Sequence, residues 1–166
     1  MRELVAARVA RLSRIGCAAI ALLVFVGDQA TKSLVERALP EHALVPILPG
    51  FFNLTHVKNA GAAFGLFSDP PALWKTALLV AVSLALVATV VGILWKSRPL
   101  PWETSVGLAL ILGGALSNLL DRIRMGLVVD FLDFHLGSYH WPAFNLADSA
   151  IVVGAGFLIL ELFLSD

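Results

Sequence analysis

Charged residues and cysteine are scarce in this sequence, and both shortages exclude classes of protein. Only 14% of its 166 residues are charged, against roughly 25% in a typical soluble domain. The 12 basic and 12 acidic residues cancel, so the composition indicates neither a nucleic-acid-binding surface nor a groove for acidic substrates. Cys17 is the only cysteine, which excludes an intramolecular disulfide. Internal repeats and low-complexity tracts are absent as well. We expect no nucleic-acid partner.

Apolar residues dominate what remains. They make up 58% of the chain, and the mean hydropathy is +0.86, which predicts an integral membrane protein. Residues 76–95 carry no charge and reach the length of about 20 residues that a bilayer requires. Residues 104–120 and 149–165 are shorter but plausible spans. The first apolar run, residues 15–27, is too short to cross at 1.5 Å per residue, so it is either a secretory signal or part of a longer helix.

The segment after this first run argues against a secretory signal. A basic start and a short apolar run suit such a signal, but the following residues, "GDQATK", lack the small-x-small pattern of a cleavage site. We therefore expect the first helix to be retained and to continue to about Ser33. Asp28 and Lys32 then lie one turn apart on the same face, where they can pair.

Basic residues near the predicted spans indicate the orientation. Arg2, Arg8, Arg11 and Arg14 precede the first helix, and the short loop after the second helix contains Lys96 and Arg98. The total of basic residues is balanced between the two sides, so the four arginines carry the prediction that both termini are cytoplasmic. We expect a single membrane domain over residues 1–166. Its helices are predicted at about 15–33, 74–95, 103–122 and 145–164, with extracytoplasmic segments at about 34–73 and 123–144.

Both outer segments have a composition that is typical of strands and tight turns. They contain "FFNLTHVKNAGAAFGLF" and "GLVVDFLDFHLG", in which β-branched and aromatic residues alternate with glycines. Their apolar character suits a platform on the outer membrane surface. The expected fold is an α-helical integral membrane protein of four transmembrane helices with a small extracytoplasmic β-platform and loop.

Polar residues gather at the extracytoplasmic level of the predicted bundle, and Glu161 is the main exception. The helix ends contribute Asp28, Lys32, Asn118, Asp121, Arg122, Asn145 and Asp148, and the outer segments contribute Asn53, His56, Lys58, Asn59, Asp130 and Asp133. An unpaired ionisable group at bilayer depth costs roughly 3 kcal/mol, so such a cluster indicates a functional site. For Asp28, Lys32 and Arg122 alone, a purely structural clamp of Asp28 with Lys32 or Arg122 is the favoured interpretation.

Three aspartates remain once Asp28 and Asp121 pair with the nearby cations. Asp130, Asp133 and Asp148 have no obvious local partner, and two carboxylates beside one water can share a proton, as in aspartic peptidases. Asp148 also follows Asn145 by three residues, a spacing that allows a role as a helix cap only. In an extended strand Asp130 and Asp133 point to opposite faces, so at most one points inward and Asp133 could face solvent. This reasoning leaves the choice between them open.

Five sequence blocks resemble the lipoprotein signal peptidase (signal peptidase II) family, in one order over nearly the whole chain. They are "GDQATK", "NLTHVKNAGAAFG", "GGALSNLLDR", "VVDFLDF" and "FNLADSAI". The resemblance implies that Asp130 and Asp148 form the catalytic pair. It also implies that six further positions shape the site or contact the lipid-modified substrate: Asp28, Lys32, Asn59, Asn118, Arg122 and Asn145.

The function implied by this resemblance is that of a membrane-embedded aspartic endopeptidase. Such an enzyme removes the signal peptide from diacylglyceryl-modified bacterial prolipoproteins and cuts before the lipidated cysteine. The implied setting is the bacterial inner membrane, with the active site near the extracytoplasmic face, membrane lipid around it and a monomeric chain. We expect no cofactor and no metal, because a carboxylate pair can activate water and His56, His135 and His140 lack a tight ligand spacing.

Three alternative functions predict a different residue pattern or a different experimental result. A small transporter or proton-conducting protein is expected to distribute its ionisable residues across the midplane, unlike this chain. A metal-dependent hydrolase using Asp130, Asp148 and His135 would lose activity with a chelator. A non-catalytic scaffold would tolerate asparagine in place of its aspartates.

Overall fold

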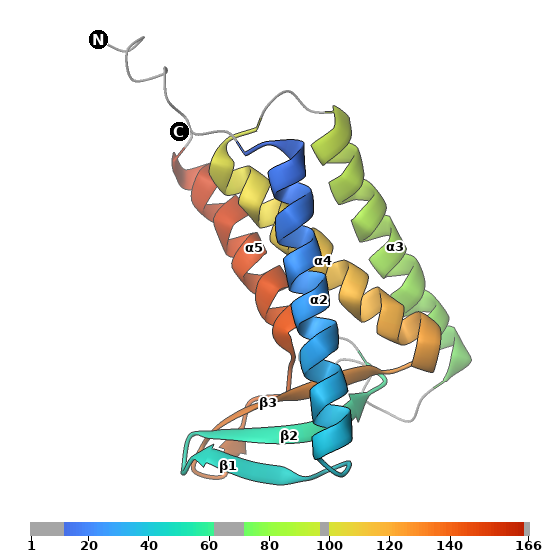
Figure 1. The fold of residues 1–166 in the computed structure, drawn as a ribbon, viewed down its shortest axis with the longest axis vertical. Coiled ribbons are helices and arrows are strands. Elements are labelled where there is room, and N and C mark those ends of the chain that lie inside the picture. Colours follow the sequence, from blue (N-terminus) through green and yellow to red (C-terminus); the bar gives the residue numbers. More distant parts are fainter. Residues whose placement is uncertain (1–11, 62–71, 97–99, 165–166) are drawn as a thin grey trace.

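The computed structural model describes residues 12–61, 72–96 and 100–164. In chain order the elements are α2 (Arg14–Ala38), β1 (Leu44–Leu48), β2 (Phe52–Asn59), α3 (Leu73–Lys96), α4 (Trp102–Met125), β3 (Val128–Leu136), β4 (Tyr139–His140) and α5 (Leu146–Leu164). The four helices run alongside one another and the strands lie at one end of them (Figure 1). The expectations for Arg2, Arg8, Arg11 and residues 62–71 lie outside the described residues.

All four helices are long and apolar enough to cross a membrane. Ser13 caps the first of them, because its Oγ accepts a 3.0 Å hydrogen bond from the backbone N–H of Gly16. This helix, α2, continues past Asp28 and ends at Ala38, beyond the end predicted at about Ser33. The prediction that the first apolar run belongs to a longer helix is therefore confirmed.

Helix α4 lies at the centre of the bundle and packs against α2, α3 and α5. Glycines allow close approach on two of these sides. A Cβ atom on Gly113 would lie 2.5 Å from the carbonyl oxygen of Ala21 in α2. On the other side, a Cβ on Gly107 would lie 2.7 Å from the carbonyl oxygen of Gly154 in α5. Small residues at such crossings let helices in a membrane gain packing energy.

The strands form an antiparallel sheet in the order β1-β2-β3-β4. The pairing of β2 with β3 places Asn53 opposite Asp133 and Val57 opposite Asp130, with an irregularity between Leu54 and Val57. The predicted strands and turns are thus present in the described parts of the two outer segments. This register sets the position of each aspartate in the sheet.

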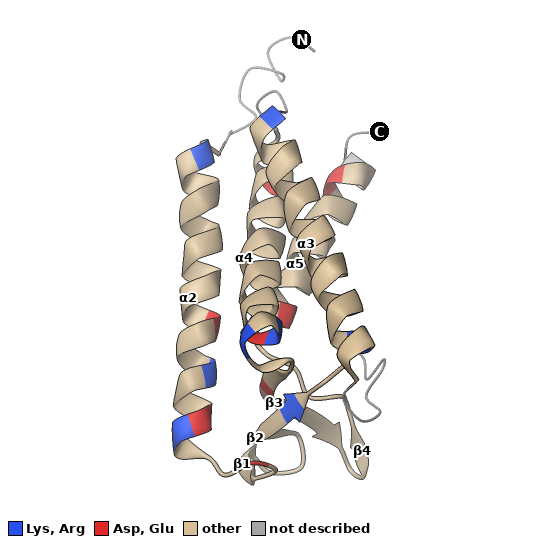
Figure 2. Cartoon of the chain, turned by 90° about the vertical axis from the view of Figure 1, so that its right-hand side faces the viewer, with Lys and Arg blue, Asp and Glu red and all other residues tan. Residues whose placement is uncertain are grey.

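Charged side chains concentrate at the end of the bundle that carries the sheet. Figure 2 shows most of the described Lys, Arg, Asp and Glu residues near the sheet and few at the opposite helix ends. The first residues of α2 and the last of α5 lie together at that opposite end (Figure 1). The predicted clustering of ionisable residues at one level is confirmed for the described residues.

Candidate active site

A buried ion cluster joins α2 to α4 at the end of the bundle that carries the sheet. Lys32 Nζ lies 2.6 Å from Asp28 Oδ2 and 2.6 Å from Asp121 Oδ2, and it donates a 2.9 Å hydrogen bond to Asn118. Asp28, Lys32 and Asp121 are all at most 3% exposed. The predicted pairing of Asp28 with Lys32 is confirmed. Arg122 lies outside this ion cluster.

Asp28 also holds the beginning of α5. Its Oδ1 accepts a 2.9 Å hydrogen bond from the backbone N–H of Ala147, and its Oδ2 accepts one of 2.7 Å from the hydroxyl of Ser117. Gln29 adds a further link from α2 to α4 through Ser117 and Asp121. The ion cluster therefore fixes the N-terminus of α5, which carries Asp148.

Asp148 lies in the first turn of α5 and takes part in a reciprocal cap. Its backbone N–H donates to Asn145 Oδ1 at 2.9 Å, and its Oδ2 accepts from the backbone N–H of Asn145 at 3.3 Å. The capping spacing seen in the sequence is confirmed. The second carboxylate oxygen accepts a 2.8 Å hydrogen bond from Asn118 Nδ2. Both oxygens are thus held in place.

Asp130 lies on β3 and is only 2% exposed. Its Oδ2 accepts a 2.9 Å hydrogen bond from Asn59 Nδ2, and its Oδ1 accepts one of 2.7 Å from Asn145 Nδ2. Burial, followed by the negative charge of Asp148, raises the pKa of Asp130 from 3.8 to about 7, although the two amide donors oppose the shift. Asp130 is therefore poised to hold or release a proton near neutral pH.

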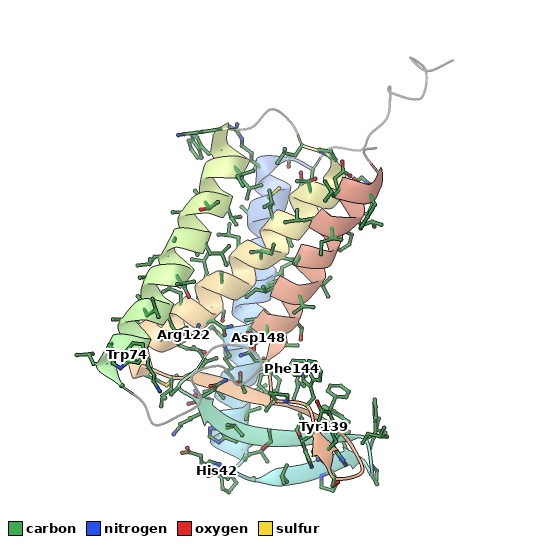
Figure 3. All side chains as sticks on the ribbon, turned by 180° about the vertical axis from the view of Figure 1, so that it is seen from behind. His42, Trp74, Arg122, Tyr139, Phe144 and Asp148 are labelled. Atoms are coloured by element: carbon green, nitrogen blue, oxygen red, sulfur yellow. The ribbon has the colours of Figure 1, made fainter. Side chains whose placement is uncertain are left out.

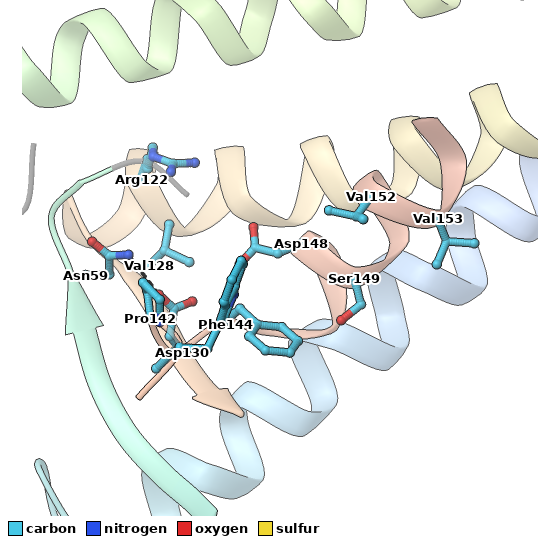
Figure 4. Close-up of a pocket in the computed structure, with 12 residues that line it drawn as sticks. Asn59, Arg122, Val128, Asp130, Pro142, Phe144, Asp148, Ser149, Val152 and Val153 are labelled. Carbon is cyan, nitrogen blue, oxygen red and sulfur yellow. Dashed lines mark hydrogen bonds between the residues drawn. The ribbon is translucent and has the colours of Figure 1, made fainter. Parts of the chain in front are cut away.

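The two carboxylates border one cavity of about 360 Å³. Figure 4 shows them among the residues that line it. The lining residues are Asn59, Arg122, Val128, Asp130, Trp141, Pro142, Ala143, Phe144, Asp148, Ser149, Val152 and Val153. The cavity is largely apolar, and Arg122 and the two aspartates are the only ionisable residues among the described residues that line it. It can hold an apolar ligand against a small number of polar atoms.

Arg122 joins the cavity to the end of β2. Its Nη2 donates a 3.2 Å hydrogen bond to the carbonyl oxygen of Gly61, and its Nη1 donates one of 3.4 Å to the carbonyl oxygen of Asn118. The guanidinium group is therefore oriented by backbone oxygens and places a cation beside the two aspartates.

Asp133 is not among the residues that line this cavity, although it is also buried. It is 5% exposed and accepts hydrogen bonds from Asn53 Nδ2 at 2.7 Å and from His140 Nδ1 at 2.8 Å. The expectation that Asp133 could face solvent is wrong, because side chains from both neighbouring strands, Asn53 of β2 and His140 of β4, contact its carboxylate and the residue is buried. Burial raises the pKa of Asp133, but the hydrogen bonds from Asn53 and His140 outweigh it and leave the pKa lowered.

His135 also lies away from the cavity. Its ring stacks on that of His140, with centroids 4.8 Å apart, which does not suit the metal site of Asp130, Asp148 and His135 considered from the sequence. Sequence reasoning overlooked Ser117 and Gln29, which hold the ion cluster. Both lie within the quoted blocks "GGALSNLLDR" and "GDQATK", and their polar side chains at a buried helix level were the available signal.

The fold and the cavity define a multi-pass helical membrane protein with paired carboxylates at one end of its bundle. The family described as Signal peptidase (SPase) II matches residues 20–164. A lipoprotein signal peptidase of Desulforapulum autotrophicum is 45% identical over 81% of this chain and 83% of its own length. That of Syntrophus aciditrophicus is 43% identical over 84% and 87%. The chain belongs to the signal peptidase II family, and it is a protease and a multi-pass bacterial membrane protein. The transporter alternative is not favoured.

Solved structures agree with this membership. A bacterial membrane enzyme solved by the in meso method at 2.3 Å resolution is similar with a TM-score of 0.79 and 30% identity, over 89% of this chain and 87% of that one. A second such structure, at 1.9 Å resolution, has a TM-score of 0.76 and 30% identity over 88% and 91%. The four helices and the small sheet are therefore an arrangement shared with known membrane enzymes.

Proposed function

We propose that this chain is an aspartic endopeptidase that removes the signal peptide from diacylglyceryl-modified prolipoproteins and cuts before the lipidated cysteine. The observation that carries this proposal is the pair of aspartates on one cavity, linked through Asn145. Asn145 donates to Asp130 and accepts from the backbone of Asp148. The names of the curated relatives, lipoprotein signal peptidases, support the substrate class.

In the proposed reaction the two aspartates share one proton. Asp130 holds it, in line with its pKa of about 7, and Asp148 is ionised in the first turn of α5, where the helix dipole favours negative charge. Asp148 takes a proton from water as the water oxygen bonds to the scissile carbonyl carbon, and Asp130 protonates the carbonyl oxygen. When the C–N bond breaks, Asp148 returns its proton to the leaving nitrogen and the new hydroxyl returns one to Asp130.

The neighbouring residues have positioning and binding roles in this proposal. Asn59 and Asn145 hold Asp130, while Asn118 and the α5 cap hold Asp148. Asp28 and Lys32 fix the beginning of α5. The Arg122 guanidinium supplies a cation for carbonyl or ester oxygens of the lipid-modified substrate. The reaction needs no metal and no cofactor, because the paired carboxyl groups handle both protons.

The proposed setting is the bacterial inner membrane, with both termini cytoplasmic and the sheet and cavity near the extracytoplasmic face. Arg14 and Lys96, at the helix ends far from the sheet, support this orientation. Val128, Val152 and Val153 give the cavity an apolar lining that suits acyl chains from the substrate and surrounding lipid. We propose that one chain is sufficient for activity, since both carboxylates come from the same chain.

Single substitutions of the two aspartates test the dyad. Asp130→Asn and Asp148→Asn should each reduce kcat on a diacylglyceryl-modified prolipoprotein by roughly 10²–10⁴-fold, because each removes one half of the proton exchange. Asp133→Asn is the matched control, from the same strand as Asp130, and should retain most of the turnover. Near wild-type turnover in either dyad variant, at equal abundance of folded protein, would show that the proposed mechanism is wrong.

A further inference from the structure

One wall of the cavity is a short connection rather than a helix or a strand. Residues 141–144 link β4 to α5, and all four of them, Trp141, Pro142, Ala143 and Phe144, line the cavity. Figure 3 shows Phe144 between the sheet and Asp148. The position of this cavity wall, residues 141–144, therefore decides how much room lies beside the dyad.

The far end of the wall is fixed to β3 by its own backbone. The N–H of Phe144 donates a 3.1 Å hydrogen bond to the carbonyl oxygen of Leu132, and its carbonyl oxygen accepts bonds from Phe131 and Leu132. Its ring also stacks on Phe134, with centroids 5.8 Å apart. These contacts hold Phe144 without any help from β4.

The near end of the wall depends on β4, which has only two residues. It pairs with β3 through His135↔His140 and Leu136↔Tyr139. The backbone N–H of Trp141 donates a 2.8 Å hydrogen bond to the carbonyl oxygen of Phe134. A two-residue strand contributes few ladder hydrogen bonds, so side-chain contacts carry a large share of its attachment.

The side-chain attachment is a chain of three residues across the sheet. His140 Nδ1 lies 2.8 Å and 3.1 Å from the two oxygens of Asp133. Asn53 on β2 donates a 2.7 Å hydrogen bond to the same carboxylate. The lowered pKa of Asp133 keeps it ionised at neutral pH, and hydrogen bonds to an ionised acceptor are stronger than neutral ones.

We propose that Asp133 and His140 are positioning residues that hold the cavity wall, residues 141–144, in place for substrate binding. This rests on the proposed function, which makes the cavity the substrate site. The dyad has separate supports in Asn59, Asn118 and Asn145. Loosening the wall therefore weakens substrate binding and leaves the chemical step intact.

Two matched pairs of variants test this role. The side-chain nitrogen of asparagine occupies the place of histidine Nδ1, whereas that of glutamine occupies the place of Nε2, so His140→Asn keeps the bond to Asp133 and His140→Gln loses it. Similarly, the side-chain oxygen introduced by Asp133→Asn can accept a hydrogen bond from His140. Its side-chain nitrogen can donate one to Asn53 once the Asn53 amide group is rotated by 180°. The alanine side chain of Asp133→Ala can form neither bond. Each pair removes the same original side chain and differs in the hydrogen bond.

Steady-state kinetics on a diacylglyceryl-modified lipobox peptide supply the first readout. His140→Gln and Asp133→Ala should raise KM by roughly three- to tenfold with kcat within about twofold of wild type. His140→Asn should return KM to within about twofold. Asp133→Asn should give a KM between those of wild type and Asp133→Ala, because it keeps the hydrogen bonds and loses the negative charge. The proposal would be overturned by any of three results: equal effects of asparagine and glutamine at position 140, a fall in kcat alone, or an unchanged KM in all four variants.

Hydrogen–deuterium exchange supplies a readout that does not depend on peptidase activity. Backbone amides of residues 139–144 should exchange faster in His140→Gln than in His140→Asn, while those of residues 44–59 remain protected. Unchanged exchange in His140→Gln would overturn the proposal even if activity fell. The two proposals can fail separately. If His140→Gln exchanged faster but Asp130→Asn kept full turnover, the proposed dyad would be wrong, while the role of His140 in attaching the wall would be supported.

Discussion

Asn145 Nδ2 lies 2.7 Å from Oδ1 of Asp130, and this contact joins the beginning of α5 to the first half of β3. The oxygen of the same side-chain amide group accepts a hydrogen bond from the backbone N–H of Asp148. Asn145 is therefore both a helix cap and a support for the buried carboxyl group. The two roles can be separated by the choice of substitution.

Asn145→Ser should keep the cap and lose the support. Serine caps helices well, but its side chain is too short to reach Asp130. We expect a melting temperature close to that of wild type and a fall in kcat of roughly tenfold or more. Asn145→Ala should lose about 1 kcal/mol of stability in addition. Thermal unfolding and cleavage kinetics on the same preparations measure both effects, and full turnover in Asn145→Ser would show that the contact with Asp130 is dispensable.

The raised pKa of Asp130 predicts the pH dependence of cleavage. The required form of Asp130 is protonated, so kcat/KM should fall as the pH rises through about 7. It should also fall in acid, where the pair takes up its second proton and the general base is lost. A pH profile on a lipidated substrate measures both limbs. A flat profile from mildly acidic to alkaline pH, with chemistry rate-limiting, would contradict the shared proton.

The close crossing of α4 and α5 predicts that Gly114 tolerates no larger residue. A Cβ atom there would meet the carbonyl oxygen of Ala147 and lie 2.9 Å from Ile151 Cγ1. Gly114→Ala should therefore destabilise the protein by about 1–3 kcal/mol and lower turnover, because Ala147 adjoins Asp148. Gly156→Ala is the control in α5, since nothing lies within 4 Å of its Cβ position. Equal melting temperatures for the two variants would contradict this packing.

The proposed orientation predicts the outcome of reporter fusions. A reporter fused after Ser97 should read cytoplasmic, and one fused after Asp69 or Ser138 should read extracytoplasmic. The orientation follows from basic residues at the helix ends that lie away from the sheet. Protease accessibility in sealed vesicles provides an independent measurement. The reverse pattern would place the cavity on the cytoplasmic side and away from exported prolipoproteins.

Local features of the site could be predicted from the sequence because they depend on short spacings. Asp28 and Lys32 pair one helical turn apart, and Asn145 and Asp148 form a cap at a three-residue spacing. The strands of the outer segments followed from their β-branched and aromatic residues. Each of these features is fixed by the geometry of a single element or its end.

Contacts that depend on register or on distant helices could not be predicted in the same way. The surroundings of Asp133 are set by how β2 and β4 align with β3, and alternation along one strand says nothing about that alignment. The hydrogen bond from Ala147 to Asp28 spans 119 residues. Such a contact exists only because the bundle brings the first and last described helices together.

That long-range contact has a consequence for biosynthesis. A ribosome makes α2 before α5. A nascent chain therefore carries Asp28 and Asp130 before it carries Asp148 or Ala147, whose backbone N–H donates to Asp28. A polypeptide that stops before Asn145 lacks both the second carboxylate, Asp148, and the hydrogen bond from Asn145 that supports the first. The proposed proteolytic centre therefore forms only after α5 has been translated and inserted. Unfinished copies in the membrane would be inert toward their neighbours.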